Sequence, residues 1–311
     1  MSLFKIENHK IKEIMACLTP ILHGKDETLV KLLVCVFAGG HVLLEDLPGL
    51  GKTTLALAVA RALGLQFGRI QCTNDLLPTD VTGLNIFKAD KGAFEFHPGP
   101  AFNNLVLVDE INRATPKTQS ALLEAMGEGQ ATVDGKTYQL PQPFFVIATQ
   151  NPVEHAGTFP LPESQMDRFM ARLSLGYPAR EAEREILRSG SQREELENIP
   201  ALLNPREIIE TQSEIEREVT VSDKIIDYIL TVAEKSRSHP DAAVGISTRG
   251  AMVLLRAARA AAWLQGRGFV IPEDVKAFAD DVLLHRLILK QGSERAKKEL
   301  LRQLFAETPA I

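Results

Sequence analysis

The chain has 311 residues, which is long enough for about two domains. Hydrophobic residues make up 45% of it and charged residues 24%, as is typical of a globular protein with a substantial buried core. The 40 acidic and 35 basic residues give a net charge of −5, which argues against a protein held on nucleic acid mainly by phosphate neutralisation.

Residues 1–38 are predicted to be helical. Apolar residues recur at near-helical spacing between Ile6 and Leu18, and the pattern is broken at Thr19-Pro20. A second apolar helix is expected from Thr28 to Phe37, ending at Gly39-Gly40.

From residue 39 to about residue 178, short apolar runs alternate with helical patterns. The predicted helices are Thr53–Leu63 and Lys117–Met126, and Gly129–Leu140 predicts a β-hairpin that turns at Asp134-Gly135. Strands that are apolar on both faces and separated by helices indicate a parallel sheet covered on each side. The predicted strands are His41–Leu44, Arg69–Cys72, Leu105–Val108, Phe144–Ala148 and Ala171–Leu175.

After Tyr177-Pro178 the pattern becomes helical, with almost no strand signal. Ser222 and Ser247 stand where helix N-caps belong, and the turn at 266–268 is expected to end the third of these helices. We therefore expect a domain boundary near 177–180. The clearest predicted helices are Ala179–Leu187, Asp223–Ser236, Thr248–Gln265 and Glu273–Leu289.

The chain carries no signal for a membrane or an oxidising compartment. Its most apolar stretch, Leu29 to Leu44, is interrupted by polar residues and is shorter than the ~20 residues that a membrane span needs. The three cysteines, Cys17, Cys35 and Cys72, lack metal-ligand spacing and suggest a reducing environment. The expected location is cytoplasmic.

The strongest functional signal is the sequence Glu-Asp-Leu-Pro-Gly-Leu-Gly-Lys-Thr-Thr at 45–54, between a predicted strand and a predicted helix. That is the context of a phosphate-binding loop, in which glycines turn backbone N–H groups toward phosphate oxygens. Lys52 would face the β- and γ-phosphates, and the Thr53 hydroxyl would ligate Mg²⁺. Asp46 occupies the first glycine position of the common pattern, where a left-handed turn is feasible for Asp. The candidate nucleotide-binding residues are Asp46, Leu47, Pro48, Gly49, Leu50, Gly51, Lys52, Thr53 and Thr54.

Two further apolar strands end in polar residues. Asp109 and Glu110 follow Leu105–Val108, and there Asp109 would hold Mg²⁺ while Glu110 would orient or deprotonate the attacking water. Asn151 follows the strand at 144–148, where its amide would contact the γ-phosphate or position water. Taken alone, each group is more typical of a solvated strand end or a turn, but the phosphate loop upstream favours the chemical interpretation.

Together these motifs resemble the MoxR family of AAA+ ATPases. The resemblance implies an α/β AAA+ P-loop NTPase core, with an insertion into the second helix at 76–102 and a pre-sensor-1 hairpin at 129–140, followed by an all-α lid. The implied domains are the N-terminal helical segment 1–38, the nucleotide-binding core 39–178 and the lid 179–311. The runs that carry the resemblance are Glu45–Thr54, Asn74–Gly83, Phe94–Pro100, Asp109–Met126, Ala148–Pro152 and Gly157–Phe169.

The resemblance also implies roles for single residues. Asn151 resembles the sensor-1 residue, Arg168 the arginine finger that reaches a neighbouring subunit's nucleotide, and Arg249 the sensor-2 arginine at the start of a lid helix. Residues 21–25 match the segment that usually lines the adenine pocket. For Arg113 two interpretations stay open, namely a contact with a neighbour's phosphate and a structural ion pair.

The expected function is hydrolysis of ATP, with Mg²⁺, by a homo-oligomeric ring, for which we expect a hexamer. The ring would remodel, mature or activate separate protein partners, expected from the resemblance to carry von Willebrand factor A domains. One alternative is a nucleotide-gated binding module with slow turnover. Another is a DNA motor, which the acidic net charge and the lack of a DNA-binding module disfavour.

Overall fold

The computed structural model describes residues 5–152, 157–190 and 193–309. In these ranges, five strands form one sheet in the order β2–β5–β8–β1–β9, and each pairing in it is parallel, as predicted. The strands predicted to begin at Arg69 and Ala171 begin two residues earlier, at Phe67 and Phe169. The strands are β1 (His41–Glu45), β2 (Phe67–Gln71), β5 (Leu105–Asp109), β8 (Phe145–Gln150) and β9 (Phe169–Leu173).

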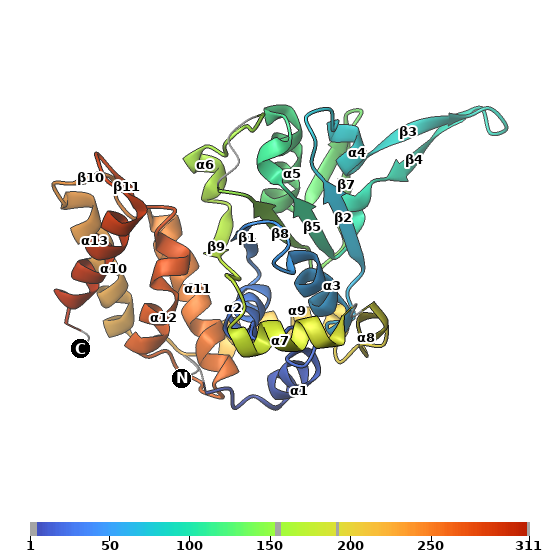
Figure 1. Ribbon diagram of the computed structural model, residues 1–311. Coiled ribbons are helices and arrows are strands. Elements are labelled where there is room, and N and C mark those ends of the chain that lie inside the picture. Colours follow the sequence, from blue (N-terminus) through green and yellow to red (C-terminus); the bar gives the residue numbers. More distant parts are fainter. Residues whose placement is uncertain (1–4, 153–156, 191–192, 310–311) are drawn as a thin grey trace.

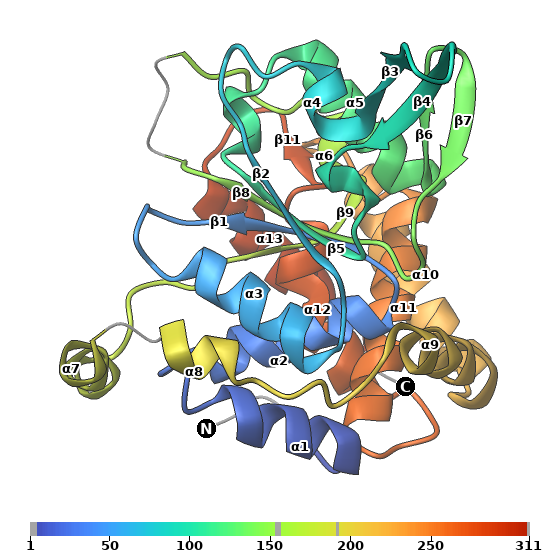
Figure 2. The same cartoon turned by 90° about the vertical axis from the view of Figure 1, so that its right-hand side faces the viewer.

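Helices cover both faces of the sheet (Figures 1 and 2). Alternate strand residues point to opposite faces, so Leu44 and Leu107 join one hydrophobic cluster while Leu43 and Val106 join another. The first cluster includes α1 (His9–Leu18), α2 (Asp26–Phe37) and α3 (Lys52–Ala62), and the second includes α4 (Pro78–Thr82) and α5 (Pro116–Glu128).

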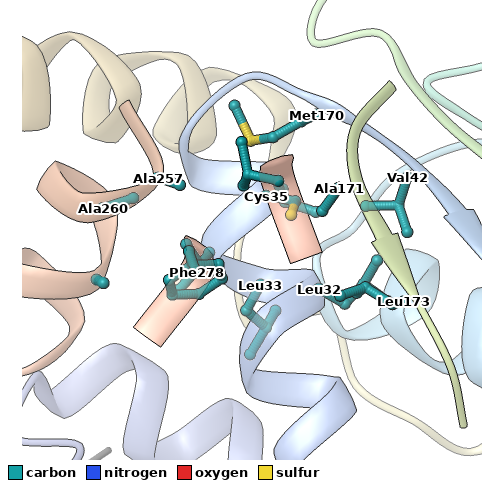
Figure 3. Close-up of a cluster of buried hydrophobic side chains, with 14 of the residues drawn as sticks. Leu32, Leu33, Cys35, Val42, Met170, Ala171, Leu173, Ala257, Ala260 and Phe278 are labelled. Carbon is teal, nitrogen blue, oxygen red and sulfur yellow. The ribbon is translucent and has the colours of Figure 1, made fainter. Parts of the chain in front are cut away.

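Helix α2 lies between the sheet and the C-terminal helices, which explains why it is apolar nearly all round. In Figure 3 its side chains Leu32 and Cys35 lie near Val42 of the sheet, and Phe278 of a C-terminal helix packs in the same cluster. Burying one such side chain stabilises the fold by about 1.5–3 kcal/mol. The α/β core and the C-terminal helices therefore share one continuous hydrophobic cluster.

The C-terminal part of the described chain is mainly helical, as predicted, but one boundary was wrong. The helix expected at 273–289 ends at Leu283, because the buried Arg286 turns back to donate to the backbone at the start of β9. Ile288–Leu289 (β11) then pairs with Ala242–Val244 (β10). None of the described helices is both long and apolar enough to span a membrane. The helices are α7 (Arg180–Ser189), α8 (Arg193–Glu197), α9 (Pro205–Glu218), α10 (Asp223–Ser238), α11 (Thr248–Leu264), α12 (Pro272–Leu283) and α13 (Glu294–Ala306).

Two hairpins project from the edge of the core. Strands β3 (Gly83–Lys88) and β4 (Ala93–Pro98) form a long arm (Figure 1), and they lie within the expected insertion. Strands β6 (Gln130–Val133) and β7 (Lys136–Gln139) form the predicted second hairpin, with Asp134 and Gly135 both at positive φ.

The two hairpins contact each other through aromatic side chains. The Phe96 ring stacks on the Tyr138 ring with 4.0 Å between centroids, so Phe96 is a packing residue. Phe94 differs, because it is 71% exposed and contacts Phe87 near the end of the arm. The arm therefore has a packed base and an exposed aromatic tip.

Candidate active site

The loop between β1 and α3 has the backbone geometry of an anion cradle. Gly49 has φ 82° and Gly51 has φ 86°, and a Cβ added at either would meet open space. Glycine is therefore needed there for the left-handed backbone, not because of a crowded neighbour. Helix α3 begins at Lys52, so its unpaired N–H groups and the positive end of its dipole face the same loop.

Lys52 folds back onto this loop. Its Nζ donates to the carbonyl oxygens of Asp46, at 2.7 Å, and Leu47, at 3.2 Å. Burial lowers the pKa of Lys52, and the negative charges of Asp46, Asp109 and Glu110 act in the opposite direction. A bound phosphate would supply a full negative charge in place of two carbonyl dipoles.

Asp46 does not adopt the left-handed turn that is feasible for Asp at this position. Among the described residues, the non-glycine positions with positive φ are Glu110 and Asp134. The buried carboxylate of Asp46 points instead to residues 174–176, beyond the end of β9. A side-chain contact, rather than a left-handed turn, therefore accounts for Asp at this position.

The two predicted acids lie at the carboxyl end of β5. Asp109 Oδ2 accepts from Arg69 Nε at 2.8 Å, and Arg69 belongs to the neighbouring strand β2. Glu110 has φ 55°, a left-handed conformation, and its N–H donates to Thr149 Oγ1 at 2.9 Å. Such a backbone costs roughly 1–2 kcal/mol, and it turns the chain sharply out of the strand.

Arginines pair with both acids. Arg113 Nη1 donates to Glu110 Oε2 at 3.1 Å, so the structural ion pair expected as one alternative for Arg113 is present. Arg69 was missed in the sequence, although it alternates with Gln71 on a strand whose other positions, Gly68 and Ile70, are buried. Arg69 and Gln71 lie on the same face of the strand, and two polar residues on one face of a sheet strand were the sequence signal for a polar site there.

One cavity of about 300 Å³ brings most of the predicted site residues together. Thr53 and Asp109 supply a hydroxyl and a carboxylate there, the oxygen ligands that Mg²⁺ prefers. The described residues hold no cluster of three or more His, Cys, Asp or Glu side chains, so this pair suits a metal that arrives with phosphate ligands. The cavity is lined by Pro48, Gly49, Gly51, Lys52, Thr53, Thr54, Arg69, Gln71, Asp109, Glu110, Thr149 and Asn151.

A second cavity of about 570 Å³ adjoins the first and shares Pro48, Gly49, Gly51 and Thr54 with it. Its other walls are mostly apolar, and they include the segment 21–25, except Gly24, which was expected to line an adenine pocket. Leu50 lines this second cavity, whereas Asp46 and Leu47 line neither of the two.

Arg168 and Arg249 do not line either cavity. Arg168 Nη1 donates to the carbonyl of Leu123 near the end of α5, at 2.8 Å. The Arg249 side chain is 60% exposed, and its Nη1 lies 3.7 Å from Asp167 Oδ2. Both arginines therefore lie beside the start of β9, apart from the phosphate loop of their own chain.

Comparisons with known proteins agree with this geometry. The model of the ATPase family associated with various cellular activities (AAA) matches residues 41–171, and the AAA lid domain matches 234–304. The uncharacterized protein YeaC of Bacillus subtilis is 47% identical over 86% of this chain and 84% of its own length.

Two further relatives cover more of the chain. Chaperone MoxR1 of Mycobacterium tuberculosis is 40% identical over 91% of this chain and 77% of its own length. A crystal structure of a candidate ATPase from Cytophaga hutchinsonii superposes with a TM-score of 0.88 and 38% identity, covering 97% of this chain and 95% of that one. The chain belongs to the MoxR family of AAA+ ATPases.

Proposed function

We propose that this chain hydrolyses ATP in the presence of Mg²⁺. The observation that carries the proposal is the meeting of Lys52, Thr53, Asp109, Glu110 and Asn151 around one cavity, at the carboxyl ends of parallel strands and the N-terminus of α3. Ligands of open α/β sheets bind at that edge.

Each of these side chains has a role that its chemistry suits. Lys52 leaves the loop carbonyls to neutralise the β- and γ-phosphates, and Thr53 and Asp109 provide oxygen ligands for Mg²⁺, which spreads the phosphate charge when bound. Glu110 accepts a proton from the attacking water, and the Asn151 amide orients that water or the γ-phosphate.

We propose that Arg168 and Arg249 act on the nucleotide of a neighbouring subunit in a homo-oligomeric ring, which we expect to be a hexamer. Neither arginine lines a cavity of its own chain, which supports this, as does their common position beside Asp167. An arginine brought to the γ-phosphate from outside stabilises the charge of the transition state.

The ring would use hydrolysis to remodel or activate separate protein partners, and we keep von Willebrand factor A domains as the expected partner type. The exposed aromatic tip of the β3–β4 arm supports a protein contact, since Phe94 and Phe87 are 71% and 55% exposed. The name chaperone MoxR1 of one relative is consistent with this role.

A second candidate function is a nucleotide-gated binding module with slow turnover. The Arg113–Glu110 ion pair favours it, because an arginine bonded to Oε2 competes with the water whose proton Glu110 would accept. The two candidates differ in rate rather than in binding site.

Two variants test the proposal. Lys52→Ala should lose tight ATP binding, because it removes the cation at the phosphates, whereas Glu110→Gln should bind ATP and fail to hydrolyse it. Calorimetry with ATP and a phosphate-release assay measure the two properties. Wild-type ATP affinity in Lys52→Ala would refute the phosphate-loop assignment, and rapid hydrolysis by Glu110→Gln would refute the role of Glu110.

A further inference from the structure

The segment 174–176 lies where the sheet leads into the C-terminal helices. It directly follows the last residue of β9, Leu173, and its backbone has no strand partner in the described sheet. Side chains from two other elements bind it instead. Those side chains belong to Asp46, at the start of the phosphate loop, and to Lys25 and Thr28, at the start of α2.

Asp46 holds the N–H side of this segment. Its carboxylate accepts from Ser174 Oγ at 2.7 Å, from the Leu175 N–H at 2.5 Å and from the Gly176 N–H at 3.1 Å. Asp46 is 6% exposed, so these bonds replace the water that a carboxylate would otherwise bind. Three charge-assisted bonds from one side chain fix three consecutive residues.

Lys25 and Thr28 hold the carbonyl side. Lys25 Nζ donates to the carbonyls of Leu175, at 3.0 Å, and Gly176, at 2.6 Å, while Thr28 Oγ1 donates to that of Ser174 at 3.0 Å. Lys25 is 7% exposed; burial lowers its pKa, and the charge of Asp46 acts in the opposite direction. The segment is therefore held from both sides by buried groups of opposite charge.

This segment forms one wall of the second cavity. Leu175 of the segment lines that cavity, as do Tyr177 and Pro178 directly after it, whereas none of the three lines the cavity that contains Lys52. Asp46 itself lines neither cavity. Its side chain therefore acts on the second cavity indirectly, by fixing the backbone of residues that form the wall.

We propose that Asp46 is a positioning residue that fixes the wall of the base-binding end of the nucleotide site and does not line the phosphate-binding end. The proposal rests on the proposed function, in that the cavity at Lys52 takes the phosphates and the adjoining cavity takes the base. If the wall is ordered before binding, no binding free energy is lost in ordering it. The affinity for ligands that contact the wall is therefore higher.

The experiment compares a ligand that has a base with one that has none. Calorimetry in the presence of Mg²⁺ measures the affinity of Asp46→Gly and of wild type for ADP and for tripolyphosphate. Every substitution of the Asp46 side chain keeps the main-chain carbonyl that Lys52 contacts. We expect Asp46→Gly to bind ADP about tenfold more weakly and tripolyphosphate within about twofold of wild type.

Two further variants remove other hydrogen bonds that hold the segment 174–176. Thr28→Val, which removes the donor to the Ser174 carbonyl, and Ser174→Ala, which removes one bond to Asp46, should each show a smaller selective loss for ADP, although neither side chain lines the cavity. Asp90→Gly is the matched control, because Asp90 lies in an exposed turn of the arm, and it should change neither affinity.

The outcomes separate this proposal from the proposed function. Equal weakening of ADP and tripolyphosphate by Asp46→Gly would make Asp46 part of the phosphate cradle and overturn the proposal. If wild type bound neither ligand, the proposed function itself would fail. Should Asp46→Gly not fold, Thr28→Val and Ser174→Ala decide, and the absence of a selective effect in both would overturn the proposal.

Discussion

Glu110 combines two features that are typical of functional residues. Its left-handed backbone carries a conformational cost, and its carboxylate is bonded to Arg113 beside the cavity that also contains Lys52. The ion pair fixes the carboxylate, but it also occupies the oxygen Oε2. If Oε2 is the oxygen that accepts the proton from water, as the proposed function allows, Glu110 must first exchange this partner for water.

If the ion pair must open before hydrolysis, removing Arg113 should change the basal hydrolysis rate. A partly exposed pair of this kind is worth roughly 0.2–1 kcal/mol, so releasing it should raise the basal hydrolysis rate of Arg113→Gln by up to about fivefold. Steady-state phosphate release at saturating ATP measures the rate, and calorimetry checks that ATP affinity stays unchanged. A tenfold fall in rate would instead show that Arg113 assists the reaction, as a contact with a neighbour's phosphate would.

His41 of β1 forms hydrogen bonds to α5 and to β8 inside the core. Its Nδ1 accepts from the Val146 N–H at 3.1 Å, so Nε2 carries the proton and donates to the Met126 carbonyl at 2.9 Å. Protonating Nδ1 would break the bond to Val146, and burial disfavours the charged ring. Burial accordingly lowers the pKa of His41 to about 4.

That pKa makes stability depend on pH. Between about pH 6.5 and pH 4 the unfolded chain binds a proton at His41 that the folded chain does not, so stability falls as pH falls through this window, by up to about 3 kcal/mol. Urea unfolding at pH 7.5 and pH 5 should show a smaller difference for His41→Gln than for wild type. His285, whose pKa burial also lowers, keeps some of the dependence in the variant. Equal pH dependence of the two proteins would contradict this account.

The site residues that could be predicted from sequence are those whose partners are close along the chain. Lys52 and Thr53 follow their glycines directly, and Asp109 ends its own strand. Arg69 could not be predicted in the same way, because its contact with Asp109 depends on β2 lying beside β5 in the sheet. The role of Asp46 likewise depends on residues 128 to 130 positions away.

At the scale of elements, one hairpin turn and one helix end show the same division. The turn at Asp134-Gly135 could be predicted because two adjacent residues favour positive φ there. The end of α12 could not, since Arg286 is drawn out of the helical pattern by Asp167 and the backbone of Phe169, more than 100 residues away. Helical periodicity reports local preference and contains no information about such a contact.

The two phenylalanines of β4 give a matched pair for testing the arm. Phe96 stacks on Tyr138, so Phe96→Ala should lose the aromatic pair and destabilise the chain by about 1–2 kcal/mol. Phe94 is exposed, so Phe94→Ala should change stability by less than about 0.5 kcal/mol and leave basal hydrolysis unchanged. Urea unfolding and phosphate release measure the two effects. Equal destabilisation by both substitutions would mean that the aromatic tip also packs against the fold.

For the whole molecule, several buried or charged contacts between the lid and the core lie at β9. Arg286 is buried and donates to Asp167 and to the carbonyls of Phe169 and Met170. Arg172, on β9 itself, pairs with Glu45 just before the phosphate loop and with Glu294 at the start of α13. Movement of the lid would therefore act directly on β9 and on the segment that leads into it.

Arg168 lies within this connection. It stands between Asp167, which Arg286 binds, and the first residue of β9, and it packs over Gly127, where a Cβ would collide with its guanidinium. The side chain is thus held against α5, outside both cavities of its own chain. An arginine fixed in this way can serve catalysis by contacting the nucleotide of a neighbouring chain.

Mixing experiments test this role together with assembly. Arg168→Ala should bind ATP but hydrolyse it poorly, since an arginine at the γ-phosphate is worth on the order of 10³–10⁵ in rate in other nucleotidases. Mixed with Lys52→Ala, it should regain activity, because a subunit with an intact loop then receives an intact arginine from its neighbour. The gain should rise with protein concentration, because it requires assembly. As a control, Arg168→Ala mixed with the double variant Lys52→Ala/Arg168→Ala should regain none. If the first mixture gave only the sum of its separate activities while both variants assembled, Arg168 would not act on a neighbour's nucleotide.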